Sequence, residues 1–293
     1  HRKRFNQLMP WVIIILMTIQ CFFLIMCNFF EDPFQPSVNP MNNASGLNPL
    51  LQHPLMVIHP PLLYMGFIGF SIPFAFALAA LLTNRVDADW IRATRRWTLF
   101  PWGCLSVAIV LGGRWAYMEL GWGGYWAWDP VENASLFPWI TGTAYLHSVL
   151  IQEKKNMLKR WNMILIMITF TLTIFGTYLT RSGIISSIHA FAATDLGIWF
   201  FGFIICIVVF NIFILWYKKD MLVSQNRLES IVSRESGFLF NNVVFVSMCA
   251  AILWGTMYPL LSEAITGVQI TIGSTYFNRV IIPFGIILLL LTG

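Results

Sequence analysis

Long, nearly uninterrupted apolar runs are the feature that most constrains how this chain can fold. A helix of about 20 apolar residues matches the thickness of a bilayer's hydrocarbon core. In lipid, every backbone polar group must be satisfied within the segment, so such runs indicate helices. We therefore expect an all-α, polytopic transmembrane helical bundle. About eight spans are expected, near residues 10–30, 62–82, 97–115, 136–152, 163–180, 197–217, 238–261 and 277–293.

Composition excludes an ordinary soluble domain. Only 11% of the 293 residues are charged and 57% are hydrophobic, whereas soluble domains carry about a quarter charged residues. We expect one membrane domain over residues 1–293. The chain begins without methionine, and its last span, 277–293, stops at Gly293 without a polar flank. We therefore expect a fragment with a truncated last span.

Basic residues mark one side of the expected membrane. Residues 2–4 and the loops 83–96, 153–162 and 218–237 together hold 15 of the 18 lysines and arginines. Loops that stay on the cytoplasmic side carry such an excess. The remaining loops, including 31–61, 116–135 and 181–196, are therefore expected outside. The basic pI reflects this topology in a lipid bilayer, and no nucleic-acid partner is expected.

The outer loops bring together two histidines and a group of tryptophans. Loop 31–61 ends in His59, which precedes two prolines and is therefore expected on non-helical backbone at the mouth of the second span. Loop 181–196 contains His189. Loop 116–135 contains WGGYWAWDPVEN, with three tryptophans in one short stretch. Tryptophans at an interface often only anchor spans, but such anchoring does not require this clustering beside glycines and acids.

Two further features stand out around the fourth span. Asp129 and Pro130 have the form of a helix start, with Glu132 in the first turn, where acidic groups are favoured. His147 lies about eleven residues into the span, roughly 16 Å deep. An ionisable residue near the bilayer midplane indicates a functional site. The alternative for His147 is a neutral imidazole that hydrogen-bonds a neighbouring helix. His53 is interpreted as an ordinary polar residue.

Haem is the ligand that best suits these residues. Imidazole is a common axial ligand of haem iron, and aromatic side chains can cover the large flat porphyrin. Zinc fits less well because no third or fourth ligand clusters with the outer histidines. The five cysteines lie inside expected spans, without a CxxC motif, so no disulfide framework is expected.

Several stretches resemble one known family. WGGYWAWDPVENASLFPWITGTAYLHS, at 122–148, resembles the tryptophan-rich "WWD" signature of haem-handling membrane proteins in cytochrome c maturation. HPPLLYMGFIGFSIPFAFALAAL at 59–81, TYLTRSGIISSIHAFA at 177–192 and YFNRVIIPFGIILLLLTG at 276–293 are similar to the CcmF/NrfE family of cytochrome c haem lyase subunits. The related CcmC and CcsA proteins share the tryptophan-rich loop, but the surrounding sequence fits them less well.

The resemblance implies two sites for haem b. His59 and His189 correspond to the histidines that ligate haem iron at the outer face, and His147 to one ligand of a transmembrane b-haem whose second ligand lies beyond this chain. Outer loops and short amphipathic segments form the haem platform. Its residues here are Trp122, Gly123, Gly124, Tyr125, Trp126, Trp128, Asp129 and Glu132. Tyr125 and Ala127 depart from the family pattern, and Ala127 lacks the usual aromatic ring.

An activity also follows from the resemblance. The family receives haem from the carrier CcmE and, with CcmH and CcmI, attaches it through thioether bonds to the CxxCH motif of apocytochrome c. The b-haem is expected to relay electrons, with quinol as their source. The membrane is then the bacterial inner membrane with the outer loops periplasmic, or the mitochondrial inner membrane in an organelle. Residues that catalyse bond formation, and the choice between CcmF and NrfE, stay unassigned.

Two functions of other classes remain open. A plain b-type electron carrier would use haem without ligation chemistry, although such proteins usually place histidine pairs on their spans. A haem transporter or exporter would explain haem sites at two depths, but the expected outer platform fits it less well than a polar path through the bundle.

Overall fold

The computed structural model describes residues 5–34, 36, 46–185, 187, 189, 196–224, 226, 230 and 233–292. Within these residues the regular structure is entirely helical, as the apolar runs predict. The long helices are α1 (Met9–Ile25), α2 (Pro54–Gly69), α3 (Ser71–Leu82), α4 (Asp89–Glu119), α5 (Pro130–Lys155), α6 (Lys159–Ser182), α7 (Gly197–Tyr217), α8 (Arg234–Thr266) and α9 (Ser274–Thr292). The short ones are η1 (Met26–Phe30), η2 (Pro49–Leu51) and η3 (Lys219–Leu222).

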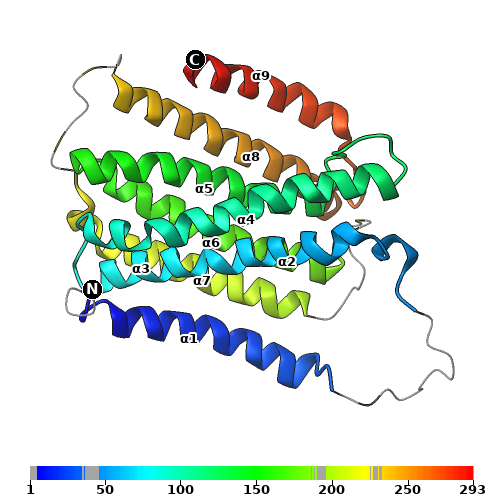
Figure 1. Ribbon diagram of the computed structural model, residues 1–293, viewed down its shortest axis with the longest axis horizontal. Coiled ribbons are helices and arrows are strands. Elements are labelled where there is room, and N and C mark those ends of the chain that lie inside the picture. The colour runs from blue at the N-terminus through cyan, green and yellow to red at the C-terminus, as the bar shows by residue number, and fades with distance from the viewer. Residues whose placement is uncertain are drawn as a thin grey trace.

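The long helices lie side by side in one bundle, with α1 at one edge and α8 and α9 at the other (Figure 1). Helix α5 is central, because it packs against α4, α6 and α8. Helix α2 packs against α4, and α3 follows it directly along the same line, so the two cross the bundle together. The main hydrophobic core runs through the packed helices and is filled by residues such as Phe70, Trp90 and Met163.

Seven helical stretches in the described part of the chain are long and apolar enough to cross a membrane, with α2 and α3 counted as one. This criterion of length and composition leaves out one of the eight expected spans. The expected span that falls short is 136–152, which lies in α5. Polar residues of α5 explain the difference, since Asn133, Thr141 and Gln152 are buried against neighbouring helices. Helix α5 still runs alongside the other spans (Figure 1).

The prediction that His59 lies on non-helical backbone was wrong. Helix α2 begins at Pro54, five residues before His59, so the outer loop ends well before residue 61. The helix starts there because Nδ1 of His53 accepts a hydrogen bond from the backbone N–H of Leu55, at 3.1 Å, and a proline suits the first helical position. His53 is thus a helix cap, and the two prolines after His59 are accommodated inside α2.

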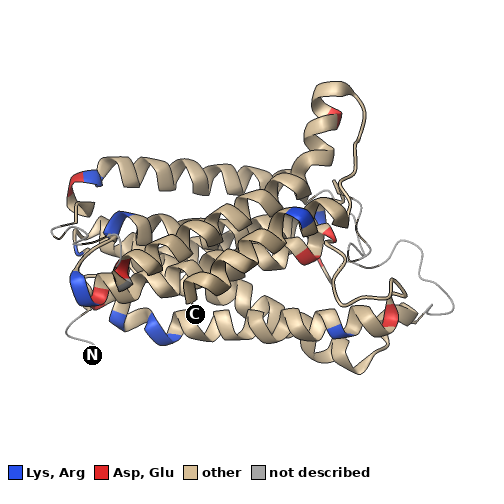
Figure 2. Ribbon diagram, turned by 90° about the horizontal axis from the view of Figure 1, so that it is seen from above, with Lys and Arg blue, Asp and Glu red and all other residues tan. Residues whose placement is uncertain are grey.

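Most basic residues lie at one end of the bundle, on the left in Figure 2. They come from the start of α4, the junction of α5 and α6, and the end of α7. The opposite end carries the loop between α4 and α5, the end of α6 and the start of α7, with His189 hydrogen-bonded to Asp129 at the start of α5. The tryptophan-rich loop and His189 therefore lie at the end away from the basic residues.

Glycines allow close helix contacts, which membrane bundles favour. A Cβ atom added at Gly142 of α5 would lie 2.8 Å from Cζ of Phe70, whose side chain is fully buried and cannot yield. We predict that Gly142→Ala lowers the free energy of unfolding by about 1–3 kcal/mol through overpacking. Unfolding in detergent, followed by circular dichroism, measures this loss.

The matched control is Gly202→Ala on α7, where an added Cβ meets nothing within 4 Å. Alanine is the better helix former, so this variant should be as stable as the parent or slightly more so. Equal destabilisation of the two variants would contradict the account of the Gly142 contact.

Candidate functional site

His59 is held firmly against helix α4. Its Nδ1 lies 2.8 Å from the backbone carbonyl oxygen of Ala108. A carbonyl only accepts, so Nδ1 carries the hydrogen and donates, which leaves Nε2 as the nitrogen that can bind a ligand. Gly112, one turn further along α4, provides the space for the ring. A Cβ added there would lie 2.5 Å from Cε1 and 3.1 Å from Nε2 of His59.

His189 is held by a carboxylate. Its Nδ1 lies 3.0 Å from Oδ2 of Asp129, and its backbone N–H donates to the Ser187 hydroxyl at 3.0 Å. The Ser187 hydroxyl donates to the same carboxylate oxygen at 2.6 Å. Here too the hydrogen-bonded nitrogen is Nδ1, so Nε2 is the ring nitrogen that can bind a ligand. The two outer histidines therefore present the same nitrogen.

The start of α5 anchors this arrangement, as the sequence predicts. Asp129 is the N-cap, Pro130 occupies the first turn, and Asp129 and Glu132 form a capping box. Oε2 of Glu132 accepts backbone N–H groups of Ala127 at 2.9 Å and Asp129 at 3.1 Å. Oδ2 of Asp129 also accepts the N–H of Val131 at 3.0 Å. One short segment thus begins the helix, fixes the end of the tryptophan-rich loop and orients His189.

The aromatic side chains of this loop point in different directions. Trp126 lines the pocket beside the two histidines, and its indole nitrogen is buried without a hydrogen-bond partner among the described residues. The ring centre of Trp122 lies 6.3 Å from that of His189. Trp128 turns away and stacks on Phe277 of α9 at 5.1 Å. Tyr125 is 60% exposed and stacks on a neighbouring tyrosine.

Trp128 has a backbone conformation that large side chains seldom adopt. Its φ is +61°, in the left-handed region, which costs a residue with a Cβ roughly 1–2 kcal/mol. Three contacts offset this cost: the stack on Phe277, a 2.9 Å hydrogen bond from the indole N–H to Asn278, and a 3.1 Å bond from the side chain of Asn133 to the Trp128 carbonyl. Trp128 therefore joins the loop to α9 and does not line the pocket.

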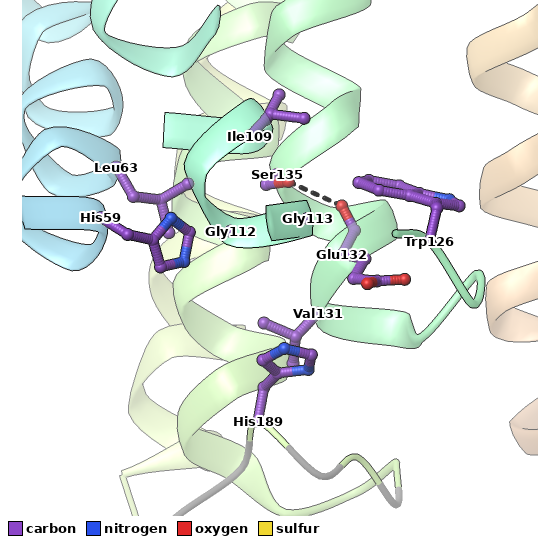
Figure 3. A pocket seen from close by; sticks show the side chains of 10 residues that line it. All are labelled: His59, Leu63, Ile109, Gly112, Gly113, Trp126, Val131, Glu132, Ser135 and His189. Atoms are coloured by element: carbon purple, nitrogen blue, oxygen red, sulfur yellow. Dashed lines mark hydrogen bonds between the residues drawn. The ribbon is translucent and has the colours of Figure 1, made fainter. Parts of the chain in front are cut away.

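Figure 3 shows the pocket that these residues form. The rings of His59 and His189 come from different elements and face a shared space, while Glu132 and Trp126 lie on the side away from His59. The remaining walls are largely apolar and come from Leu63, Ile109, Gly112, Gly113, Val131 and Ser135. The empty space is about 370 Å³, including the part open to solvent.

His147 lies in a separate place. It is 17 residues beyond Pro130 on α5, so about 26 Å along the helix and about 7 Å past its midpoint toward the basic end. Its ring packs between Phe238 and Phe245 of α8, with ring centres 5.8 and 5.9 Å away. Its Nδ1 is buried and has no hydrogen-bond partner in the described part of the chain. It also lines a pocket of about 830 Å³ between α4 and α5.

The histidine nitrogen atoms that face the outer pocket are suited to bind haem iron. Two imidazoles with Nδ1 already engaged resemble metal-binding histidines, whose other ring nitrogen usually donates to a carbonyl or carboxylate. The apolar walls and the unpaired indole nitrogen of Trp126 suit a flat ligand with an apolar body and polar substituents. At the inner position, the unpaired Nδ1 of His147 between two phenylalanines offers a single imidazole ligand in apolar surroundings.

The structure brings most of the residues predicted for this site close together, beside others that the sequence did not single out. His59, His189, Trp126 and Glu132 meet at one pocket, with Trp122 and Asp129 next to His189. Gly123 and Gly124 form the turn of the loop, where the Gly124 carbonyl accepts the Trp122 indole N–H at 3.1 Å. The missed residues are Ala108, Gly112, Gly113, Ser187 and Asn278. The adjacent Gly112 and Gly113 were the signal in the sequence that could have indicated this contact, because small residues in membrane helices mark places of close approach.

Fold and site together define a multi-pass helical membrane protein that presents two histidines and a tryptophan-rich loop at one end of its bundle. The chain belongs to the cytochrome c assembly protein family, whose model matches residues 2–186. Within that family it groups with CcmF and NrfE, as the following similarities show.

The chain is 44% identical over 260 residues to the cytochrome c-type biogenesis protein CycK of Bradyrhizobium diazoefficiens, covering 89% of this chain and 39% of that one. It is 42% identical over 275 residues to CcmF of Pseudomonas aeruginosa, covering 93% and 42%. It is 36% identical over 297 residues to the probable biogenesis protein NrfE of Escherichia coli, covering 99% and 52%. The chain thus spans roughly two fifths to one half of these relatives.

A solved structure titled cytochrome c heme lyase CcmF is similar to this fold, with a TM-score of 0.76 and 36% identity. The match covers 96% of this chain and 40% of that one. It supports the all-helical membrane fold over nearly the whole chain.

The capping role of Glu132 can be tested by substitution. Glu132→Ala removes the acceptor for two backbone N–H groups and should lower the free energy of unfolding by about 1 kcal/mol. Glu132→Gln should stay close to the parent, because glutamine serves equally in a capping box. Chemical unfolding in detergent distinguishes them, and an equal loss in both variants would assign the effect to the charge and not to the cap.

Proposed function

We propose that this chain carries the haem-binding part of a cytochrome c haem lyase. In this proposal haem is held at the outer pocket while it is attached covalently to apocytochrome c. The observation that supports it most strongly is the pair of histidines at one pocket, each with Nδ1 hydrogen-bonded and Nε2 left to bind iron. Membership in the cytochrome c assembly family supports the same function.

The residues have distinct tasks in this proposal. His59 and His189 would hold the iron of the substrate haem through their Nε2 atoms. Trp126 and Trp122, which lie beside these histidines, would help to enclose the haem, and Asp129 would keep His189 in the required tautomer. Trp128, Gly123, Gly124 and Tyr125 shape the loop, with Trp128 tying it to α9. Each thioether bond forms when a cysteine thiol adds across a vinyl group, with sulfur bonding one carbon and hydrogen the other, without net oxidation.

His147, the inner histidine, has a separate role in this proposal. His147 would supply one ligand to a resident b-type haem, with the other ligand supplied by another part of the protein. That haem would supply electrons that keep the iron at the outer pocket reduced, with a quinol as their source. The spacing supports separate sites, because 15 residues of α5 between Glu132 and His147 span about 22 Å.

The proposed setting follows from the distribution of charge. Basic residues at one end of the bundle indicate the cytoplasmic side of a bacterial inner membrane, so the outer pocket would be periplasmic. The proposed partners are the haem carrier CcmE, the subunits CcmH and CcmI, and apocytochrome c with its CxxCH motif. The two alternatives are a plain b-type electron carrier, which usually places its histidine pairs on membrane spans, and a haem transporter, which a polar path through the bundle would fit better than an outer pocket.

Reconstitution separates the three functions. The full-length protein, with its partner subunits in lipid vesicles, is mixed with haem-loaded carrier and a CxxCH peptide. We expect covalent haem on the peptide, detected by mass spectrometry. A peptide whose cysteines are replaced by serine is the control and should acquire none. Electron transfer without covalent product would support the carrier, and haem crossing the vesicle without product would support the transporter.

The ligand assignment predicts a spectroscopic pattern. His59→Ala and His189→Ala should each change the spectrum of the outer haem, because each removes one axial ligand. His147→Ala should remove the inner haem and leave the outer one. The absorption spectrum of the purified, haem-loaded protein measures both changes.

The control is His53→Asn, since asparagine is also a favoured N-cap and should preserve the start of α2. Its spectrum should equal that of the parent. Unchanged spectra in all three ligand variants would refute the assignment.

A further inference from the structure

We propose that the two outer histidines are unequal, with His59 the permanent ligand and His189 the one that the histidine of an incoming CxxCH motif displaces. Asp129 is then the positioning residue that sets how firmly His189 is held. This inference rests on the proposed function, because it needs iron between the two imidazoles. It concerns which ligand departs when the substrate haem passes to the apocytochrome.

The surroundings of His59 leave its ring little freedom. The residue lies within helix α2, which packs closely along α4. Its Nδ1 is bonded to a carbonyl oxygen of the α4 backbone, which cannot move without the helix. The ring also fills the space above Gly112, where even a methyl group would come within 2.5 Å of it. Removing this imidazole from iron would require the two helices to separate or the hydrogen bond to break.

The surroundings of His189 are different in kind. It lies outside the helices, between the end of α6 at Ser182 and the start of α7 at Gly197. No backbone carbonyl of a neighbouring helix holds its ring in the described structure. The ring is held by the side chain of Asp129, at 3.0 Å. Rotation of the His189 side chain alone can therefore move the imidazole away from iron, with the loss of one hydrogen bond between side chains.

The direction from which the substrate approaches also favours His189 as the ligand that is displaced. Figure 3 shows His59 extending from a helix of the bundle, whereas His189 extends from the chain between helices. The end of α6 and the start of α7, which flank His189 in the sequence, lie at the loop end of the bundle, together with the tryptophan-rich loop. A peptide arriving from the aqueous phase therefore meets the side of the pocket that His189 occupies. The face occupied by His59 is covered by α2 and α4.

Asp129 controls the strength of this replaceable ligand. A carboxylate bonded to the N–H of a ligating imidazole orients the ring and raises its basicity, and loss of such a partner typically weakens metal binding 10–100-fold. The Ser187 hydroxyl, at 2.6 Å from Oδ2, fixes the same carboxylate oxygen. Asp129→Asn keeps an N-cap for α5 but replaces the charged acceptor with a neutral one.

The test measures ligand exchange in the full-length, haem-loaded protein. A peptide with serines in place of both cysteines of CxxCH supplies the incoming histidine but cannot form thioether bonds. Its displacement of a ligand is followed by stopped-flow absorption, separately from haem content. We expect Asp129→Asn to raise the exchange rate on the order of tenfold, in line with the weaker ligand, and Ser187→Ala to raise it in the same direction. Gly112→Ala, which crowds the His59 ring, should lower haem content, and its loaded fraction should exchange ligands more slowly than Asp129→Asn.

The control is Gly103→Ala on the same helix, where an added Cβ meets nothing within 4 Å; it should match the parent in both haem content and rate. Faster exchange in Gly112→Ala with no change in Asp129→Asn would make His59 the departing ligand and overturn the proposal. Equal effects of both variants, or none, would overturn it as well. Failure of the proposed haem-binding function would give a different result. In that case the haem spectrum would be unchanged in both His59→Ala and His189→Ala.

Discussion

The structure of the outer site depends on one carboxylate oxygen, Oδ2 of Asp129. It accepts hydrogen bonds from the Val131 backbone, the Ser187 hydroxyl and the His189 ring. The first bond begins α5, and the other two bring the segment after α6 onto that helix start. A negative charge is favoured at a helix N-terminus, so the group that stabilises α5 is also suited to orient an imidazole. Helix α5 then carries His147 into the bundle, which links the two proposed haem positions through one rigid element.

The second constraint is the closeness of α2 and α4. Glycines at 112 and 113 let the His59 ring and the backbone of the tryptophan-rich loop approach α4. The Ala108 carbonyl, although part of a helix, is also near enough to accept from His59. Packing therefore selects the ring nitrogen that faces the pocket. The two histidines reach the same chemical state by different means, a backbone carbonyl for one and a carboxylate for the other.

Much of the fold and of the arrangement around the outer pocket could be predicted from the sequence. The apolar runs gave an all-helical membrane bundle, and Asp129, Pro130 and Glu132 correctly marked the start of α5. One prediction was wrong, and two further features could not be derived from the sequence alone, each for a physical reason. Local proline rules placed His59 outside a helix, but a cap at His53 begins α2 earlier. Helix α5 runs alongside the other spans but is too polar for the criterion of length and composition, and several of its polar residues are buried against neighbouring helices. Periodicity could not show that Trp128 faces α9 and not the pocket, because loop direction depends on distant contacts such as Asn278.

The central claim is that His59 and His189 bind one haem iron between them. A high-resolution structure of the full-length protein loaded with haem tests it most directly. The account predicts iron within coordination distance of Nε2 of both histidines, with both Nδ1 hydrogen bonds retained and Trp126 against the ring. Iron bound by only one of these histidines in the loaded resting state, or haem seated away from the pocket, would contradict it.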